Sequence, residues 1–208
     1  NGTQVEFDQT SIDGVSSFNS DGFDVSHTNS DAVNQLNTTY VGWAWKAGGS
    51  SGTFNIDGRG YATAAEAGLT AGTKASLLTG ASVNTESGFS ILTWTGDGTN
   101  SNLQIPHGLP SRPMMVVIKK RNEAVDHWYV AHDGIQGNNY AYRMFWGPTK
   151  GGNLPDGSTT TTDPYYLATQ SSNDTLFLNN TTTNGGGNEN NITYVAYCWS
   201  EVPGYSKM

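Results

Sequence analysis

The stretch Thr193–Trp199 reads TYVAYCW, and it decides the fold because its apolar side chains alternate large and small. In an extended strand Val195, Tyr197 and Trp199 point to one face. The other face carries Tyr194, Ala196 and Cys198. Two apolar faces are typical of a strand that is buried on both sides. We therefore predict a central strand of a β-sandwich. Its large face should fill a core, and its small face should let another layer approach closely.

The same pattern occurs earlier in the chain. Asn37–Lys46 (NTTYVGWAWK) matches Asn191–Ser200 (NITYVAYCWS), which begins 154 residues later. The residues before each copy also correspond loosely, Gly22–Val25 (GFDV) to Thr175–Leu178 (TLFL), and an Asn-rich polar loop follows each. Repeats of this kind are typical of elongated arrays rather than of catalytic domains.

The repeat predicts a modular organisation. We expect residues 1–47 to be the C-terminal part of a preceding module and residues 48–87 to be a connector rich in Gly, Ala and Thr. A short helical turn is expected within this connector, at Ala62–Gly68 (ATAAEAG). Residues 88–203 should form one complete β-sandwich module, and residues 204–208 should begin a following segment. The motif Gly88-Phe89-Ser90 returns there as Gly204-Tyr205-Ser206.

Strand signals dominate the remaining chain, as short apolar runs bounded by Gly, Asn, Asp and Ser. The clearest runs are Thr39–Lys46, Gly88–Trp94, Met114–Arg121, Trp128–His132, Ala141–Trp146, Thr175–Asn179 and Ile192–Trp199. Repeated Asp-Gly pairs can supply the positive φ angles of tight turns. These signals predict an all-β fold, an antiparallel β-sandwich of jelly-roll or concanavalin-like type with at most one short helix.

Composition argues against several classes of function. Eighteen acidic residues oppose ten basic ones, for a net charge of −8, whereas binding to nucleic acid requires clustered Lys and Arg. The one basic cluster, Lys119–Arg121, resembles a strand that exits into solvent. Cys198 is the only cysteine, so an intrachain disulfide cannot form, and it reads as a small buried residue. No stretch approaches the roughly 20 apolar residues of a membrane helix.

Catalytic chemistry has no clear signal in the sequence. A retaining glycosidase needs two carboxyls about 5–5.5 Å apart, which on one strand means a spacing of two or four residues. The acidic residues fall at turns or in loops instead, and a pair assembled across strands stays open. His127 and His132 are five residues apart, so on a strand they point to opposite faces and make a poor metal pair. We expect no catalytic residue, no metal and no cofactor.

Aromatic residues leave a binding function open. Tyr140, Tyr142, Met144 and Trp146 share one face of a predicted strand. Trp128 and His132 share a face of the strand expected beside it. An exposed aromatic face can stack on the apolar side of a sugar ring, so Trp128, His132, Tyr140, Tyr142 and Trp146 are the candidate ligand-binding residues. The favoured interpretation is that this stripe is core.

Several longer strings resemble one family. The string TYVAYCWSEVPGYSK (Thr193–Lys207) is similar to a module of unknown function found in tandem in virion proteins of bacteriophages, mainly marine phages. The resemblance extends to Gly88–Thr99, Pro106–Arg121, His127–Ile135, Ile56–Thr73 and Ser82–Ile91. It covers most of the chain, whereas residues 137–164 and the first residues depart from it. The resemblance implies β-sandwich modules in a structural or tail-associated protein, and it carries no catalytic residues.

From these patterns and the resemblance we expect a non-enzymatic virion module, in a tail fibre or a tail-associated protein, that serves assembly and host-surface contact. A capsid decoration or head fibre protein and a carbohydrate-binding domain are the alternatives, and a polysaccharide-degrading enzyme is the least favoured. The expected partners are other virion proteins, further copies of the chain (a trimer among the options) and a host-surface glycan. The expected location is the exterior of the virion, on tail or head.

Overall fold

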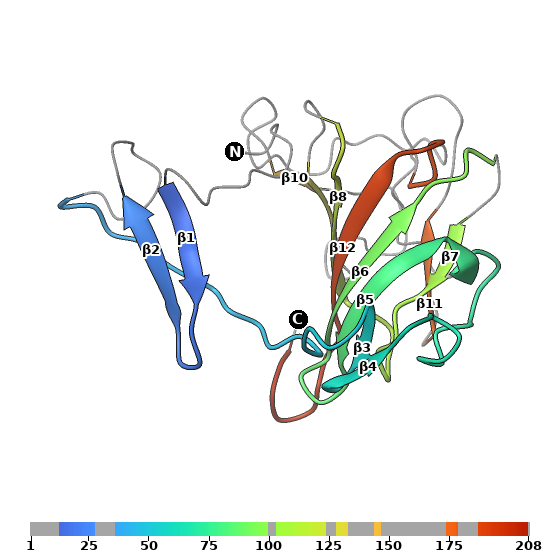
Figure 1. Cartoon of the computed structure of the whole chain (residues 1–208), viewed down its shortest axis with the longest axis horizontal. Helices are drawn as coiled ribbons and strands as arrows, with labels where there is room; N and C mark the ends of the chain where they lie inside the picture. The colour runs from blue at the N-terminus through green and yellow to red at the C-terminus, as the bar shows by residue number, and fades with distance from the viewer. Residues whose placement is uncertain are drawn as a thin grey trace. The chain divides into compact units, whose positions relative to one another are not determined.

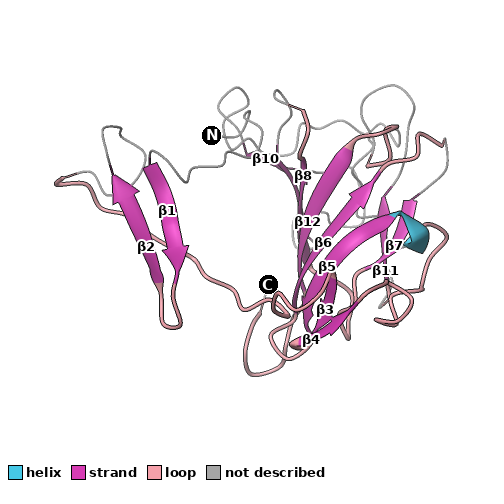
Figure 2. Cartoon of the chain, in the orientation of Figure 1, coloured by secondary structure: helices cyan, strands magenta, loops and turns pink. Residues whose placement is uncertain are grey.

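The structure of the protein is a computed structural model, shown in Figures 1 and 2. The structure describes residues 13–27, 36–99, 103–123, 128–132, 144–146, 174–178 and 187–207. The chain consists of two compact units. One consists of residues 6–44, and the other of residues 1–5 and 45–208. They are called the small unit and the large unit below, and each is described by itself.

An eight-stranded mixed sheet forms the centre of the large unit (Figure 1). Its spatial order is β10–β9–β8–β12–β6–β5–β3–β4. In sequence order its strands are β3 (Phe54–Ile56), β4 (Arg59–Tyr61), β5 (Leu78–Asn84), β6 (Phe89–Thr95), β8 (Met115–Lys120), β9 (Trp128–His132), β10 (Met144–Trp146) and β12 (Thr193–Trp199). All neighbours are antiparallel except β3 and β5, which run parallel.

A second, smaller layer covers one face of this sheet. It contains the antiparallel pair β7 (Leu103–Pro106) and β11 (Thr175–Leu178). Ile105 of β7 and Leu176 of β11 are fully buried in the main core cluster, together with Leu92 and Trp94 of β6. The result is a β-sandwich with layers of unequal size, and the predicted all-β class is confirmed.

Strand β12 is the central strand that the sequence predicts. It pairs with β6 on one side and with β8 on the other, and Tyr194, Ala196 and Cys198 are completely buried. These three lie in the main core cluster, whereas Trp199 lies in a second cluster on the opposite face with Phe89. The main core therefore lies on the small face, where the β7–β11 layer packs closely, and Tyr197 and Trp199 of the large face belong to the second core cluster, as the sequence predicts. Ala196 and Cys198 leave room that larger neighbours fill, among them Trp94, which stacks on Tyr194.

The segment expected to be a connector, residues 48–87, contributes β3, β4 and β5 to the sheet. Its glycines allow close backbone packing. A Cβ atom on Gly48 would lie 2.2 Å from the carbonyl oxygen of Val83. The hairpin between β3 and β4 turns at Asp57 and Gly58, where both φ angles are positive (52° and 87°), as a two-residue turn of this kind requires. The Gly-rich composition of this segment, which predicts a connector, therefore reflects tight contacts within the sheet.

A single helical turn connects β4 to β5. The backbone N–H of Glu66 donates to Thr63 Oγ1, and the Glu66 carboxylate accepts from the N–H of Ala62, which is close to a capping box. Gly68 has φ of 74°, and Leu69 N–H donates to the carbonyl of Ala64, as in a Schellman motif. This turn lies at the expected position, although the only helix assigned among the described residues is the 3-10 turn η1 (Ala75–Leu77). The long crossover lets β3 and β5 run parallel, which departs from the purely antiparallel sheet that we expected.

The described strands of the small unit are β1 (Asp13–Phe18) and β2 (Phe23–His27), an antiparallel hairpin. Residues 36 and 37 form a turn, and residues 38–47 carry neither strand nor helix, although the sequence predicts a strand at Thr39–Lys46. A two-stranded hairpin is marginally stable by itself. A strand needs ladder partners, and residues 39–44 belong to none of the sheets among the described residues, where β1 and β2 pair with each other.

Candidate functional site

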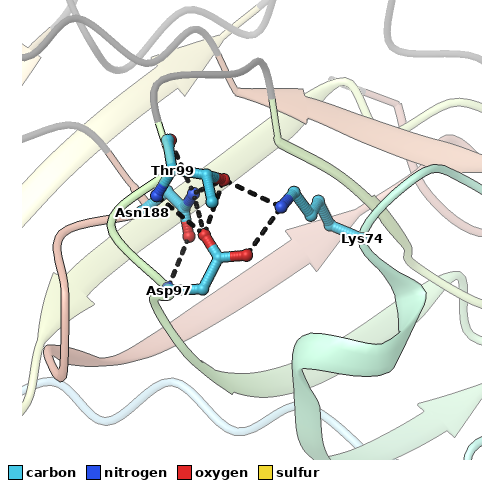
Figure 3. A network of polar contacts seen from close by, with 4 residues as sticks. All are labelled: Lys74, Asp97, Thr99 and Asn188. Atoms are coloured by element: carbon cyan, nitrogen blue, oxygen red, sulfur yellow. Dashed lines mark hydrogen bonds and ion pairs between the residues drawn. The ribbon is translucent and has the colours of Figure 1, made fainter.

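A polar network joins three loops at one end of the large sheet (Figure 3). Lys74 comes from the turn before η1, Asp97 and Thr99 come from the loop after β6, and Asn188 comes from the turn before β12. Lys74 Nζ lies 2.6 Å from Asp97 Oδ2 and 2.8 Å from Thr99 Oγ1. Asn188 Nδ2 donates to Asp97 Oδ1 at 2.7 Å, and Asn188 Oδ1 accepts from the Asp97 N–H at 3.0 Å. Within the network, the bonds between Asp97 and Asn188 join residues that are 91 positions apart.

The carboxylate of Asp97 is engaged at both oxygens. Besides the bond from Asn188, Oδ1 accepts from the backbone N–H and the hydroxyl of Thr99, at 3.0 Å and 2.7 Å. Desolvation raises the pKa of Asp97, but the bonds from Lys74, Thr99 and Asn188 together outweigh it and hold the pKa well below its ordinary value. A carboxylate held ionised in this way is a poor proton donor. The network is therefore suited to fastening the loops.

A second charged cluster lies where β8 ends. Lys120 is buried, with its Nζ 2.9 Å from Glu123 Oε2 and 2.7 Å from Glu189 Oε1. The two carboxylate oxygens thus lie at most about 5.6 Å apart, the sum of these contacts. Glu189 Oε1 makes no hydrogen bond among the described residues, so its contact with Lys120 is an ion pair only. Here the structure brings together two carboxylates from separate loops that sequence reasoning did not pair.

The basic cluster does not exit into solvent as expected. Lys119 and Lys120 are only 2% and 6% exposed, whereas Arg121 is exposed. Burial of Lys120 is tolerated because two carboxylates neutralise it. The tyrosine hydroxyl of Tyr194 accepts from the Glu189 N–H at 3.1 Å, and burial raises its pKa well above the ordinary value. Arg121 is therefore the one exposed residue of this cluster, whereas binding to a phosphate backbone requires clustered Lys and Arg.

Of the five candidate ligand-binding residues, the structure describes three. Trp128 is half-buried and packs against Tyr197, with ring centroids 6.2 Å apart. Trp146 pairs with Trp128 across β10 and β9, so these two residues lie opposite each other in the sheet. His132 is half-buried at the other end of β9, opposite Met115 of β8. Tyr140 and Tyr142 lie outside the described residues. The second core cluster includes Trp128 at its margin.

Other reactive side chains in the described part of the chain have structural environments. His107 is fully buried, and its Nδ1 accepts from the N–H of Leu109 at 3.0 Å. Burial raises the pKa of the Cys198 thiol to about 12, and Ser90 beside it lowers the pKa by less. The described residues contain no group of three or more His, Cys, Asp or Glu placed to hold a metal. Among them, no helix is long and apolar enough to cross a membrane.

Comparison with known proteins gives one match. No curated protein and no solved structure shows significant similarity to the chain. A family described as a domain of unknown function covers residues 1–208. The chain therefore belongs to the DUF7483 family.

Proposed function

We propose that this chain is a non-enzymatic structural module of a bacteriophage virion, in a tail fibre or tail-associated protein, that serves assembly and host-surface contact. The observation that carries this proposal is the use of the polar and charged groups. Asp97 and Lys120 each bind several partners, among them residues of other loops, so these two charged groups fasten the sandwich and are not poised toward a substrate. The sequence resemblance to tandem phage modules supplies the virion setting.

A tightly packed sandwich suits a protein that must stay folded outside the cell. Buried aromatic clusters lie on both faces of β12, and bonds between residues far apart in sequence hold its loops. Such a domain gains stability from packing without needing disulfides, and Cys198 is buried and protonated at neutral pH. Partners would then be other virion proteins or copies of the chain. A capsid decoration or head fibre protein is the first alternative.

The test is the protein content of purified phage particles that encode this chain. We expect mass spectrometry to find its peptides in washed particles at a fixed stoichiometry to the major capsid protein. Brief protease treatment of intact particles should cleave the chain while leaving internal proteins whole. Recovery only from the host lysate, with none in the particles, would contradict a virion role.

A carbohydrate-binding function is the second alternative, and the β9–β10 register favours it. Trp128 and Trp146 are partners in the strand register, and aromatic residues at paired positions of neighbouring strands can form a platform for a sugar ring. Glycan-array binding that is lost in Trp128→Ala but kept in His132→Ala would support this reading. Binding unchanged by Trp128→Ala would reject it.

A polysaccharide-degrading enzyme is the least favoured alternative. The two Lys120-bound oxygens of Glu123 and Glu189 lie at most about 5.6 Å apart, whereas a retaining glycosidase places its two carboxyls about 5–5.5 Å apart. However, the Lys120 ammonium contacts both carboxylates and fills the space that a sugar would have to enter. We expect no release of reducing sugar from bacterial polysaccharides by the intact chain. Hydrolysis that disappears in Glu189→Gln would show that the cluster is catalytic.

A further inference from the structure

The two copies of the repeated sequence begin with the same kind of turn. Asn37 and Asn191 occupy the same position in the two copies, and their φ angles are 63° and 61°. Only three non-glycine residues among those described have a positive φ, and these two are among them. A left-handed asparagine is uncommon enough that its occurrence at both repeat positions indicates equivalent local structure. The copies therefore correspond in conformation as well as in sequence, up to the point where the strand begins.

The two copies of the repeated sequence also resemble each other in what packs against them. Phe23 of β2 corresponds to Leu176 of β11, and Gly42 corresponds to Ala196 of β12. A Cβ atom on Gly42 would lie 3.4 Å from the Phe23 ring, so these two positions are neighbours in the small unit. Leu176 and Ala196 belong to one core cluster in the large unit. In the small unit an antiparallel strand pair thus lies beside the repeated sequence, as the β7–β11 pair shares a core with β12 in the large unit, although β1 and β2 form a hairpin and β7 and β11 do not.

What differs is the covering of the strand. In the large unit β6 and β8 flank β12, and its Tyr194 and Val195 are 0% and 4% exposed. Their counterparts Tyr40 and Val41 are 50% and 70% exposed, and Trp43 is 74% exposed. Apolar exposure of this extent marks a surface that another chain segment covers. The covering that fits is known from the large unit, where two antiparallel strands supply it.

We propose that Thr39–Ala44 is a donor strand, which inserts between two strands of the β6 and β8 kind that belong to another copy of this fold. Insertion would pair its backbone N–H and C=O groups on both sides and bury the side chains that are now exposed. It would also give the β1–β2 hairpin a sheet to pack on, as β7–β11 has in the large unit. The inference rests on the repeat and its geometry, and it holds whether or not the chain is part of a virion.

The test vacates the position of β12, between β6 and β8, in the chain of residues 1–208. This position is called the slot. Val195→Pro with Tyr197→Pro removes two ladder donors from β12, so that β12 cannot remain between β6 and β8. Each molecule then carries a vacant slot and an intact donor strand. We expect this variant to associate, with at least twice the wild-type mass in light scattering and slowed amide exchange at residues 39–44. The matched control adds Val41→Pro and Trp43→Pro, which disable the donor, and it should lose both effects.

If the two Pro variants have the same mass and the same exchange at residues 39–44, the proposal is wrong. Association of the wild-type chain through residues 39–44 would also overturn it, because β12 already occupies the slot of that chain.

A second variant tests the strand itself. Ala196→Gly, Tyr197→Trp and Cys198→Ala place the sequence of residues 39–45 in β12, and this variant should melt in one cooperative transition. The control with Gly and Trp exchanged (Ala196→Trp, Tyr197→Gly, Cys198→Ala) should melt about 10 °C lower or fail to fold. Equal behaviour of the pair would contradict the proposal.

Discussion

Trp45 packs edge to face against Trp199, with ring centroids 5.3 Å apart and an interplanar angle of 69°. Both rings also lie near Phe89, at 6.1 Å and 5.1 Å. The two tryptophans occupy the same position in the two sequence copies, so the end of one copy packs on the end of the other. Such edge-to-face pairs add about 0.5–1.5 kcal/mol beyond the area that they bury.

Trp199 should be a main contributor to stability. It is 6% exposed in the second core cluster, so Trp199→Ala should lower the free energy of unfolding by about 3–5 kcal/mol, measured by urea denaturation. Trp199→Phe should cost much less, because the buried Nε1–H makes no hydrogen bond among the described residues. Trp45→Ala, at a half-exposed position, should cost about 1 kcal/mol. A loss below 1 kcal/mol for Trp199→Ala would show that the buried-strand interpretation is wrong.

Asp97 should make the fold sensitive to acid. Its pKa is lower in the folded state than in the unfolded state, so its contribution is present above the unfolded pKa of about 4. That contribution is lost as the pH falls below this value toward the lower folded pKa. Wild type should therefore lose stability below about pH 4 more steeply than Asp97→Asn does, as measured by thermal melts from pH 6 to pH 2. Parallel pH profiles for the two proteins would contradict the role of this carboxylate.

Removing the carboxylate of Asp97 should also loosen its loops. Asp97→Ala leaves Lys74 and Asn188 without their main partner and should cost about 2 kcal/mol, discounted because Asp97 is 30% exposed. Asp57→Ala is a comparison within the same fold, since the Asp57 carboxylate accepts two bonds from Thr85, which lies in the turn between β5 and β6 at the other end of β6 from Asp97. Hydrogen exchange should quicken around residues 187–191 in Asp97→Ala but not in Asp57→Ala.

Cys198 should be unreactive in the folded protein. Burial raises its pKa to about 12, so the thiolate fraction at pH 8 is very small and the sulfur is inaccessible. A maleimide reagent should label the chain only after unfolding, when one thiol per chain becomes available. Labelling of native protein within minutes, without loss of structure, would contradict the buried position of β12.

The charge cluster at Lys120 should be held by mutual neutralisation. Lys120→Met keeps the side-chain length but leaves Glu123 and Glu189 without their shared cation, and it should cost about 2–3 kcal/mol in chemical denaturation. The triple change Lys120→Met, Glu123→Gln and Glu189→Gln should recover part of that loss. No recovery in the triple variant would show that Lys120 acts through packing alone.

The strands with strong apolar patterns were predictable from the sequence. The predicted Trp128–His132 matches β9, and Ile192–Trp199 differs from β12 by one residue. Strands β1, β4, β5 and β7 went unpredicted because they are short or rich in Gly, Ser and Thr, and their pairing partners decide their conformation. The converse holds at Thr39–Lys46, where a strong strand pattern forms no strand in the described structure.

The polar networks could not be predicted in the same way. Asp97 and Asn188 are 91 residues apart, and Lys120 contacts Glu189, which also lies far from it in the sequence. Only the register of β12 against β6 and β8 brings these loops together. Glu86, Asp97, Glu123 and Glu189 lie in loops or turns as predicted, but the sequence carries no signal for which loops meet. The two candidate aromatics Tyr140 and Tyr142 lie outside the described residues, so their placement on one face with Trp146 stays a prediction.

The most direct test of the proposed virion role is gold-labelled antibody imaging of intact phage particles, with antibody raised against this chain. The account predicts label on the exterior of the particle, concentrated on the tail or its fibres, and none on particles of a phage that lacks the gene. Label spread over the head would identify a decoration protein instead. Absence of label from intact particles, with strong label in host lysate, would contradict the proposed function.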